Sequence, residues 1–232
     1  MNYKIYYLIV NLLLIASLSI AYATDIYVFY PTDIRPKSLQ GKINHLCPDI
    51  KTIAFGRVVD FYRQIEQLPP QAIISLSPVI VRNDKYNADL KGSRQGQYEE
   101  DYVLISLDQP VDLTQIAQLK IGVLDILGRK PMKQFMNDLF HKKVKIKRVI
   151  KTEDFLPLLT FKLADAIFVS KTTYKKLQAK SKQNLIATET GIRLGLAVTG
   201  VQQQNKKISQ CIKQFDSSTN TLLGVDYWEA RR

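Results

Sequence analysis

The chain has 232 residues, a formal net charge of +12, 46% hydrophobic residues and 23% charged residues. These are the values of a globular protein that can bury a sizeable core in one domain or two small lobes, and they exclude a disordered or low-complexity chain. The basic charge favours anionic ligands or surfaces.

A cleavable export signal is predicted at residues 1–23. Lys4 lies in a short n-region, residues 5–20 are almost wholly apolar, and Ala21-Tyr22-Ala23 gives the small-x-small cleavage pattern. A retained membrane anchor is the alternative, but a span needs about 20 apolar residues and this run is shorter. No cysteine lies at the cleavage site, so a lipoprotein anchor is not indicated. We therefore expect a secreted, periplasmic protein in an oxidising compartment.

Strands and helices alternate in the first part of the mature chain. Strands are predicted at residues 26–30, 52–55 and 72–76, and helices at residues 37–46 and 58–68. This order is typical of a parallel sheet with helices on its faces. Residues 83–101 are polar and contain two glycines, which predicts a long loop, followed by a strand at 102–107 and a connector at 108–112.

A second α/β unit follows. Strands are predicted at residues 119–124, 144–150, 166–169 and 185–187, and helices at 131–140, at 155–163 and after Ser170, which can cap the last one. The strand at 144–150 is strongly basic, which favours a position near a sheet edge. A strand at 194–198 and a helix at 206–215 come last.

The positive charge is concentrated in this second unit. Residues 113–192 hold 16 Lys and Arg against 6 Asp and Glu, a net charge of +10. A solvated basic face is the simple explanation, and a field that attracts an anion is the functional one. Nucleic acid is the usual partner of such a field, but export and the lack of interleaved aromatic residues argue against it.

Cys47 comes at the end of a series of apolar residues at helical spacing, and Cys211 lies within another such series. Both cysteines are therefore expected to face inward. In an oxidising compartment this even count favours a disulfide, and two separate buried thiols are the alternative. If the bridge forms, the C-terminal segment returns to the first unit. The chain then crosses between lobes near residues 108–112 and again near 191–195, and a cleft between the lobes becomes the favoured ligand site.

Four segments carry a resemblance to a known family. They are residues 102–107 (YVLISL), 119–123 (LKIGV), 163–169 (LADAIFV) and 195–198 (GLAV). In this order they resemble the crossover and second-lobe strands of type II periplasmic solute-binding proteins, and most of all the phosphate- and phosphonate-binding (PhnD-like) proteins of ABC transporters. Where those proteins often carry a Ser/Thr-rich segment, this chain has residues 125–131 (DILGRKP).

The resemblance implies a two-lobed α/β fold, each lobe a mostly parallel sheet flanked by helices. Lobe one comprises residues 24–110 and 194–232, and lobe two comprises the inserted residues 111–193. It further implies capture of a small ligand for an inner-membrane transporter, and the basic second lobe makes an anionic ligand the first expectation. We expect a monomer without a cofactor. A sensory or accessory domain that docks a membrane kinase or cyclase is the alternative, and an enzyme on the same scaffold is a weaker one.

Candidate ligand residues follow from one rule, that ligands of open parallel sheets bind beyond the carboxyl ends of strands, at helix N-termini. The candidates are Thr32, Asp33, Gly56, Arg57, Ser75 and Ser77 in lobe one, and Asp125, Gly128, Arg129, Lys130, Ser170, Lys171 and Thr172 in lobe two.

The strongest candidate is the basic loop of Gly128, Arg129 and Lys130. An arginine fork suits carboxylate or phosphate, and basic residues are unfavourable at a helix N-terminus, so their presence there indicates a ligand; a solvent-exposed basic helix start is the alternative. Helix capping is the favoured explanation of Ser170, Lys171 and Thr172, turn capping is the alternative for Asp33 and Asp125, and a surface ion pair is the alternative for Arg57. No metalloprotease, nucleophile-elbow or P-loop motif is present, and no spacing suggests a metal site. We therefore expect a binding protein rather than an enzyme.

Overall fold

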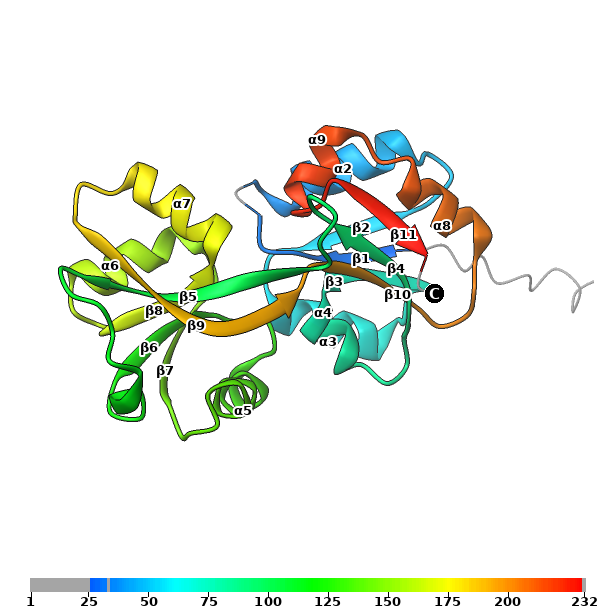
Figure 1. Ribbon diagram of the computed structural model, residues 1–232. Helices are drawn as coiled ribbons and strands as arrows, with labels where there is room; N and C mark the ends of the chain where they lie inside the picture. Colours follow the sequence, from blue (N-terminus) through cyan, green and yellow to red (C-terminus); the bar gives the residue numbers. More distant parts are fainter. Residues whose placement is uncertain (1–25, 33, 231–232) are drawn as a thin grey trace, which may run out of the picture.

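The computed structural model describes residues 26–32 and 34–230, which form two α/β lobes side by side (Figure 1). The first lobe is built on a six-stranded sheet in the order β11-β4-β10-β3-β1-β2, and the second on a five-stranded sheet in the order β7-β6-β8-β5-β9. The predicted signal at residues 1–23 lies outside the described residues.

The first lobe combines both ends of the described chain. Its strands are β1 (Ile26–Phe29), β2 (Thr52–Phe55), β3 (Ala72–Leu76), β4 (Asn87–Ser93), β10 (Ala197–Val201) and β11 (Tyr227–Ala230). Its helices are α2 (Pro36–Leu46), α3 (Val58–Gln67), α4 (Ser77–Val81), α8 (Lys206–Lys213) and α9 (Ser217–Leu222). Helices α2, α8 and α9 cover one face of the sheet, and α3 and α4 cover the other (Figure 1).

The second lobe is the middle of the chain. Its strands are β5 (Glu99–Leu107), β6 (Lys120–Leu124), β7 (Lys145–Val149), β8 (Ala166–Ser170) and β9 (Leu185–Gly195). Its helices are α5 (Arg129–Phe140), α6 (Phe155–Thr160) and α7 (Lys171–Lys180), with two short 3-10 turns at Leu113–Gln115 and Thr152–Asp154. The basic strand β7 is an edge strand, as predicted.

Strand alternation explains how the sheets separate the core into layers. In β1, Ile26 and Val28 pack with α2 and α8, whereas Tyr27 and Phe29 point to the opposite face, toward α3. The Tyr27 and Phe29 layer continues without interruption into the second lobe, where it includes Met132 of α5. One apolar cluster therefore joins the two lobes, while α6 and α7 pack on a separate cluster.

Two antiparallel strands, β5 and β9, connect the lobes (Figure 1). β5 also pairs with β8 over residues 102–105, so it belongs to the second sheet. The first crossing thus lies at residues 94–98, before β5, and not near residues 108–112 as predicted, because the long strand carries the chain to the far side of the second lobe. The return crossing is close to the prediction, at Gly195 and Leu196, where the Leu196 N–H donates to the Tyr98 carbonyl at 2.9 Å.

The predicted disulfide is confirmed. Cys47 follows α2 and Cys211 lies in α8, with a Cα–Cα distance of 5.9 Å across 164 positions of sequence. Both cysteines are buried in the layer on the α2 face of the first sheet. The bridge holds the C-terminal segment on the first lobe, as expected from the sequence if the two cysteines were bonded.

Several elements differ from the sequence prediction. The polar segment 83–101 is not a loop: it forms β4, a hairpin turn and the start of β5. The strands predicted at 185–187 and 194–198 are parts of β9 and β10, and α4, α9 and β11 were not predicted. The sheets are mixed rather than mostly parallel, since only β2-β1-β3 and β7-β6-β8 run parallel.

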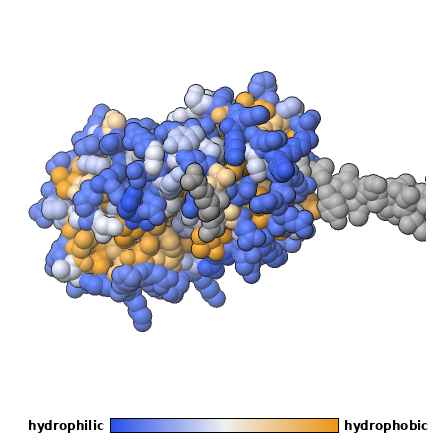
Figure 2. Space-filling view, turned by 45° about the vertical axis from the view of Figure 1, so that its right-hand side comes forward, coloured by the Kyte–Doolittle hydropathy of each residue, from blue (hydrophilic) through white to orange (hydrophobic). Residues whose placement is uncertain are grey.

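Hydrophilic residues cover most of the face seen in Figure 2, while apolar residues gather low on the second lobe. Among the described residues, none of the helices has the length and apolarity that a membrane crossing requires.

Candidate ligand-binding site

Three adjoining pockets lie where the two lobes face each other, and Pro31 and Thr152 line all three. The hinge pocket, next to β5 and β9, has a volume of about 100 Å³. The wide pocket, between the loop after β1 and residues 150–153, has a volume of about 360 Å³. The lysine pocket, lined by Lys176 and Lys180, measures about 180 Å³. Together they form an interlobe cleft of the kind in which ligands bind.

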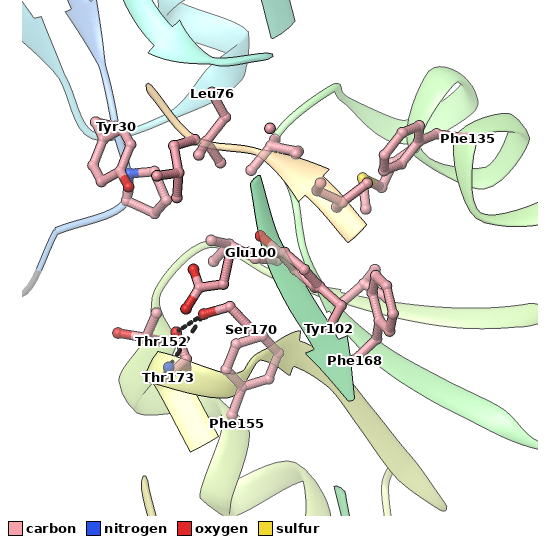
Figure 3. A pocket seen from close by; sticks show the side chains of 18 residues that line it. Tyr30, Leu76, Glu100, Tyr102, Phe135, Thr152, Phe155, Phe168, Ser170 and Thr173 are labelled. Atoms are coloured by element: carbon pink, nitrogen blue, oxygen red, sulfur yellow. Dashed lines mark hydrogen bonds between the residues drawn. The ribbon is translucent and has the colours of Figure 1, made fainter. Parts of the chain in front are cut away.

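The hinge pocket has aromatic walls and a small polar side (Figure 3). Its aromatic residues come from both lobes and are Tyr30, Tyr102, Phe135, Phe155 and Phe168. The Tyr102 and Phe168 rings lie 5.0 Å apart. Its polar side chains are Glu100, Thr152, Ser170 and Thr173. A small molecule here would contact rings and methyl groups on one side and the polar side chains on the other.

The two tyrosines of this pocket are held in their neutral form. Burial raises the pKa of Tyr30 and Tyr102 well above the ordinary value of 10.0, and the negative charge of Glu100 adds to the rise. Both hydroxyls therefore keep their protons throughout the physiological pH range.

Of the candidates in lobe one, the structure places Thr32 and Gly56 at the wide pocket. The Thr32 hydroxyl is engaged locally, donating to the Ile34 carbonyl at 3.1 Å. Asp33 lies outside the described residues. Arg57 lines none of the three pockets and forms an exposed ion pair with Asp60 at 3.6 Å, the simpler of its two predicted roles.

The two lobe-one serines are structural. Ser75 is fully buried within the sheet and donates to the Phe29 carbonyl at 2.6 Å, which fixes β3 against β1. Ser77 begins α4, and its N–H donates to the Leu196 carbonyl at 3.2 Å. Its side chain packs against Gly195, where any Cβ would come within 2.6 Å of the serine Cβ. Ser77 therefore supports the return crossing rather than the cleft.

In lobe two, the loop before α5 is organised by Asp125, which lines the wide pocket. This buried carboxylate accepts a hydrogen bond from the Gly128 N–H at 2.8 Å and pairs with the Arg148 guanidinium. Gly128 has a φ of +84°, which is the reason for glycine there. Arg129 and Lys130 are exposed in the first turn of α5 and line none of the three pockets.

At the start of α7 the candidates have separate roles. Ser170 lines the hinge pocket, and its oxygen caps the helix by accepting the Thr173 N–H at 3.2 Å. Lys171 forms ion pairs with Glu189 at 3.0 Å and with Asp101 at 3.4 Å, and these partners raise its pKa. The Thr172 N–H, the group expected to meet a ligand anion, donates to Glu100 at 3.0 Å.

Sequence reasoning missed most of the pocket lining. Tyr30, Glu100, Tyr102, Thr152 and Phe168 all face the hinge pocket, although none was a candidate. Tyr30 and Thr152 follow strand ends, so the rule used for the candidates could have found them. Glu100 and Tyr102 lie at the start of β5, a segment that was expected to be a loop up to residue 101.

Among residues 26–32 and 34–230, no group of three or more His, Cys, Asp or Glu side chains is arranged to hold a metal ion. The Ser170 oxygen accepts the Thr173 N–H as a helix cap, and the Ser170 hydroxyl donates to Thr173 Oγ1 at 3.1 Å. The cleft thus offers shape, rings and hydrogen bonds, which are the means of non-covalent recognition.

Comparisons with known proteins support the two-lobed fold. No family model and no curated protein sequence matches the chain. Among solved structures, a putative L-cystine ABC transporter protein from Listeria monocytogenes matches at 10% identity over 89% of this chain and 98% of that one, with a TM-score of 0.61. The arginine-bound substrate-binding protein AbpA from Streptococcus pneumoniae matches at 12% identity over 86% and 93%, with a TM-score of 0.57.

A domain of a different protein shares the same architecture. The VFT2 domain of BvgS from Bordetella pertussis matches at 8% identity over 90% of this chain and 95% of that one, with a TM-score of 0.56. At these identities the likeness establishes the fold alone. That fold is the two-lobed architecture of solute-binding proteins, in agreement with the fold that the sequence resemblance implied.

Proposed function

We propose that this protein is a periplasmic solute-binding protein that captures a small molecule between its lobes and delivers it to an ABC-type transporter of the inner membrane. The observation that carries the proposal is the cleft itself. Tyr30 and Pro31 of lobe one face Thr152 and Ser170 of lobe two across one pocket, beside the two strands that join the lobes. A ligand in that position contacts both lobes and would stabilise their closed arrangement.

The proposed mechanism is closure about the crossover strands without covalent chemistry. β5 and β9 contain a register shift at Tyr102 and Val103, where Thr190 and Gly191 form a bulge and Gly191 has a φ of +71°. A bulge in the connecting ribbon allows the ribbon to bend while the sheets stay intact. The lobes then separate to admit the ligand and close to bury it.

The ligand is proposed to carry an anionic group, in line with the net charge of +10 in residues 113–192. Cationic side chains line the outer part of the cleft: Arg35 and Lys151 at the wide pocket, and Lys176 and Lys180 at the lysine pocket. An anion placed there would be attracted by several lysines and remain partly solvated. The narrower class suggested by the resemblance, phosphonates, stays a prediction.

Native mass spectrometry of the purified protein tests the capture of a ligand. We expect one small molecule to be released per chain when the complex is activated. Purified protein that carries no ligand, and that shows no thermal stabilisation by a broad panel of metabolites, contradicts the proposal, because a ligand that binds only the folded form raises the melting temperature.

A double substitution, Lys151→Gln with Lys180→Gln, tests the anionic group. We expect it to weaken an anionic ligand by more than about tenfold, because two cations near the ligand are lost. Arg129→Gln is the matched control: it removes an exposed cation of the same lobe that lines none of the pockets. If Arg129→Gln weakens binding and the double variant does not, the site lies at the start of α5, as the sequence predicted.

The second candidate function is sensing, the alternative that the sequence left open, and the VFT2 domain of BvgS has the same two-lobed fold. In that case the same cleft would bind the ligand, and the charged surface of lobe two would dock a membrane kinase or cyclase. A permease and an ATPase encoded beside the gene would support transport, and a kinase or cyclase gene would support sensing.

A further inference from the structure

The polar side of the hinge pocket is built around one carboxylate of the protein itself. Glu100 lies on β5 at the crossing between lobes, and its side chain is 13% exposed. Figure 3 shows this carboxylate in the middle of the pocket, between Tyr30 on one side and Ser170 and Thr152 on the other. It occupies the place beside the α7 N-terminus where an external anion was expected.

The groups near the α7 N-terminus that could bind an external anion are consequently already bonded to Glu100. The Thr172 N–H in the first turn of α7 donates to Glu100 Oε1 at 3.0 Å. The Arg94 guanidinium pairs with the same oxygen at 2.8 Å, and its side chain is only 24% exposed. Both contacts fall on Oε1, so Oε2 is the oxygen that remains for a group within the pocket, as far as the described residues show.

The surroundings make a second anion costly. Apart from Thr152, Ser170 and Thr173, the side chains that line the pocket around Glu100 are rings and aliphatic chains. Both Tyr30 and Tyr102 lie near enough to Glu100 to be affected by its charge. A ligand carboxylate or phosphate in this pocket would lose its water and face Glu100 without a cation of its own, because Arg94 is already paired. A hydroxyl or ammonium group would instead donate to the carboxylate, and the aromatic walls would favour an ammonium group further.

We infer that Glu100 is a specificity-determining residue, which makes the hinge pocket take the apolar, hydrogen-bond-donating end of the ligand and reject a carboxylate or phosphate there. This inference rests on the proposed function, and it refines the ligand class. The ligand enters with a ring or short aliphatic group bearing a hydroxyl or amine, and any anionic group it carries stays at the outer lysines.

Three probes with the same ring test the inference: benzyl alcohol, benzylamine and benzoate. Binding is followed by NMR titration of the backbone amides, with Thr172 and Gly195 reporting on the hinge pocket. We expect the alcohol and the amine to shift these amides and benzoate to bind at least about tenfold more weakly, because it places like charges together. Benzoate binding as tightly as benzyl alcohol to the unmodified protein overturns the inference, whatever the variants do.

Two variants then assign the preference to a residue. Glu100→Gln keeps the shape and the acceptor oxygen but removes the charge, and it should reduce the difference between alcohol and benzoate to less than about threefold. Glu99→Gln removes an exposed carboxylate next to Glu100 on β5 that lines none of the three pockets, and it should leave that difference unchanged. A difference that persists in Glu100→Gln, or that disappears equally in Glu99→Gln, contradicts the role of Glu100.

The same titration separates this inference from the proposed function. If none of the three probes moves the hinge-pocket amides, the inference fails because the pocket does not take such groups. A ligand found by native mass spectrometry would still support the proposed function in that case.

Discussion

At the scale of single residues, the two carboxylates with mostly buried side chains at the cleft, Glu100 and Asp125, are paired within the protein. Glu100 is paired with Arg94 and with a backbone N–H, and Asp125 is paired with Arg148 and with the Gly128 N–H. Each carboxylate also holds a segment of backbone in place through a hydrogen bond. Glu100 links β5 to the first turn of α7, and Asp125 closes the turn before α5. A buried charge is tolerated only when it is paired and hydrogen-bonded in this manner.

Arg148→Met tests the pairing of Asp125. The side chain of Asp125 is 5% exposed, so removal of its cation leaves a buried charge with a single N–H partner. We expect a loss of about 2–3 kcal/mol in the free energy of unfolding, measured by urea denaturation. Lys147→Met on the same strand, where the lysine is exposed, is the control and should change stability by less than about 0.5 kcal/mol. Adding Asp125→Asn to Arg148→Met should restore part of the loss. Equal effects of the two single substitutions would contradict the pairing.

At the scale of elements, most helices and strands could be predicted because their apolar residues recur at clear spacing, as in α3 with Val58, Phe61 and Ile65. β4 could not, because it is buried through Leu90, Gly92 and Ser93, of which only the leucine is a large apolar residue. Its partners β10 and β11 supply the apolar side chains instead. Gly96 was nevertheless a sequence feature that is typical of a hairpin turn. In the structure Gln95 and Gly96 have φ of 51° and 74°, which is the geometry of a tight two-residue turn.

The helix α9 is expected to lose stability at low pH, because its N-terminal cap is a carboxylate. Asp216 caps the helix by accepting the Thr219 N–H at 2.7 Å, and this hydrogen bond lowers the pKa of the carboxyl below 3.8. A folded-state pKa below the unfolded value gives stability that is fully present above pH 3.8 and is lost as the pH falls through the lower value. Asp216→Asn keeps a capping oxygen that does not titrate. We expect the melting temperature of the unmodified protein to fall more steeply than that of Asp216→Asn below about pH 4. Parallel curves would show that the cap carries no proton linkage.

At the scale of the whole molecule, the fold brings the two ends of the described residues together in the first lobe and leaves the middle of the chain as a second lobe. The disulfide between α2 and α8 and the pairing of β10 with β3 both hold the C-terminal segment on the first lobe. Residues Tyr30 and Ser170, far apart in sequence, consequently face one pocket. The candidate ligand site is thus a product of chain return, since residues of both lobes line it.

Reduction of the disulfide should therefore affect the lobes unequally. The bridge closes a loop of 164 positions, and the chain-entropy model gives a stabilisation of up to about 5 kcal/mol for so long a loop. We expect hydrogen exchange to accelerate in β1, β3 and β10 after reduction, with β6 and β8 much less affected. A variant with Cys47→Ser and Cys211→Ser, compared with and without the reductant, separates loss of the bond from other effects of the reagent. Uniform acceleration in both lobes would contradict a stabilisation confined to the first lobe.

The sequence by itself determined the alternation of strands and helices, the inward position of both cysteines, the basic character of the second lobe and the expectation of two lobes. These properties depend on local spacing and composition, which a single chain displays directly. Tertiary structure alone decided which strand ends share a cleft and which polar groups remain for a ligand. Arg129 and Lys130 looked most suited to an anion, yet they are exposed and line none of the three pockets. The α7 N-terminus is instead occupied by Glu100, which lies 72 residues before Thr172. The reason is physical: a helix N-terminus attracts whichever anion the fold brings to it, and the pairing of distant strands is not encoded in the spacing of nearby residues.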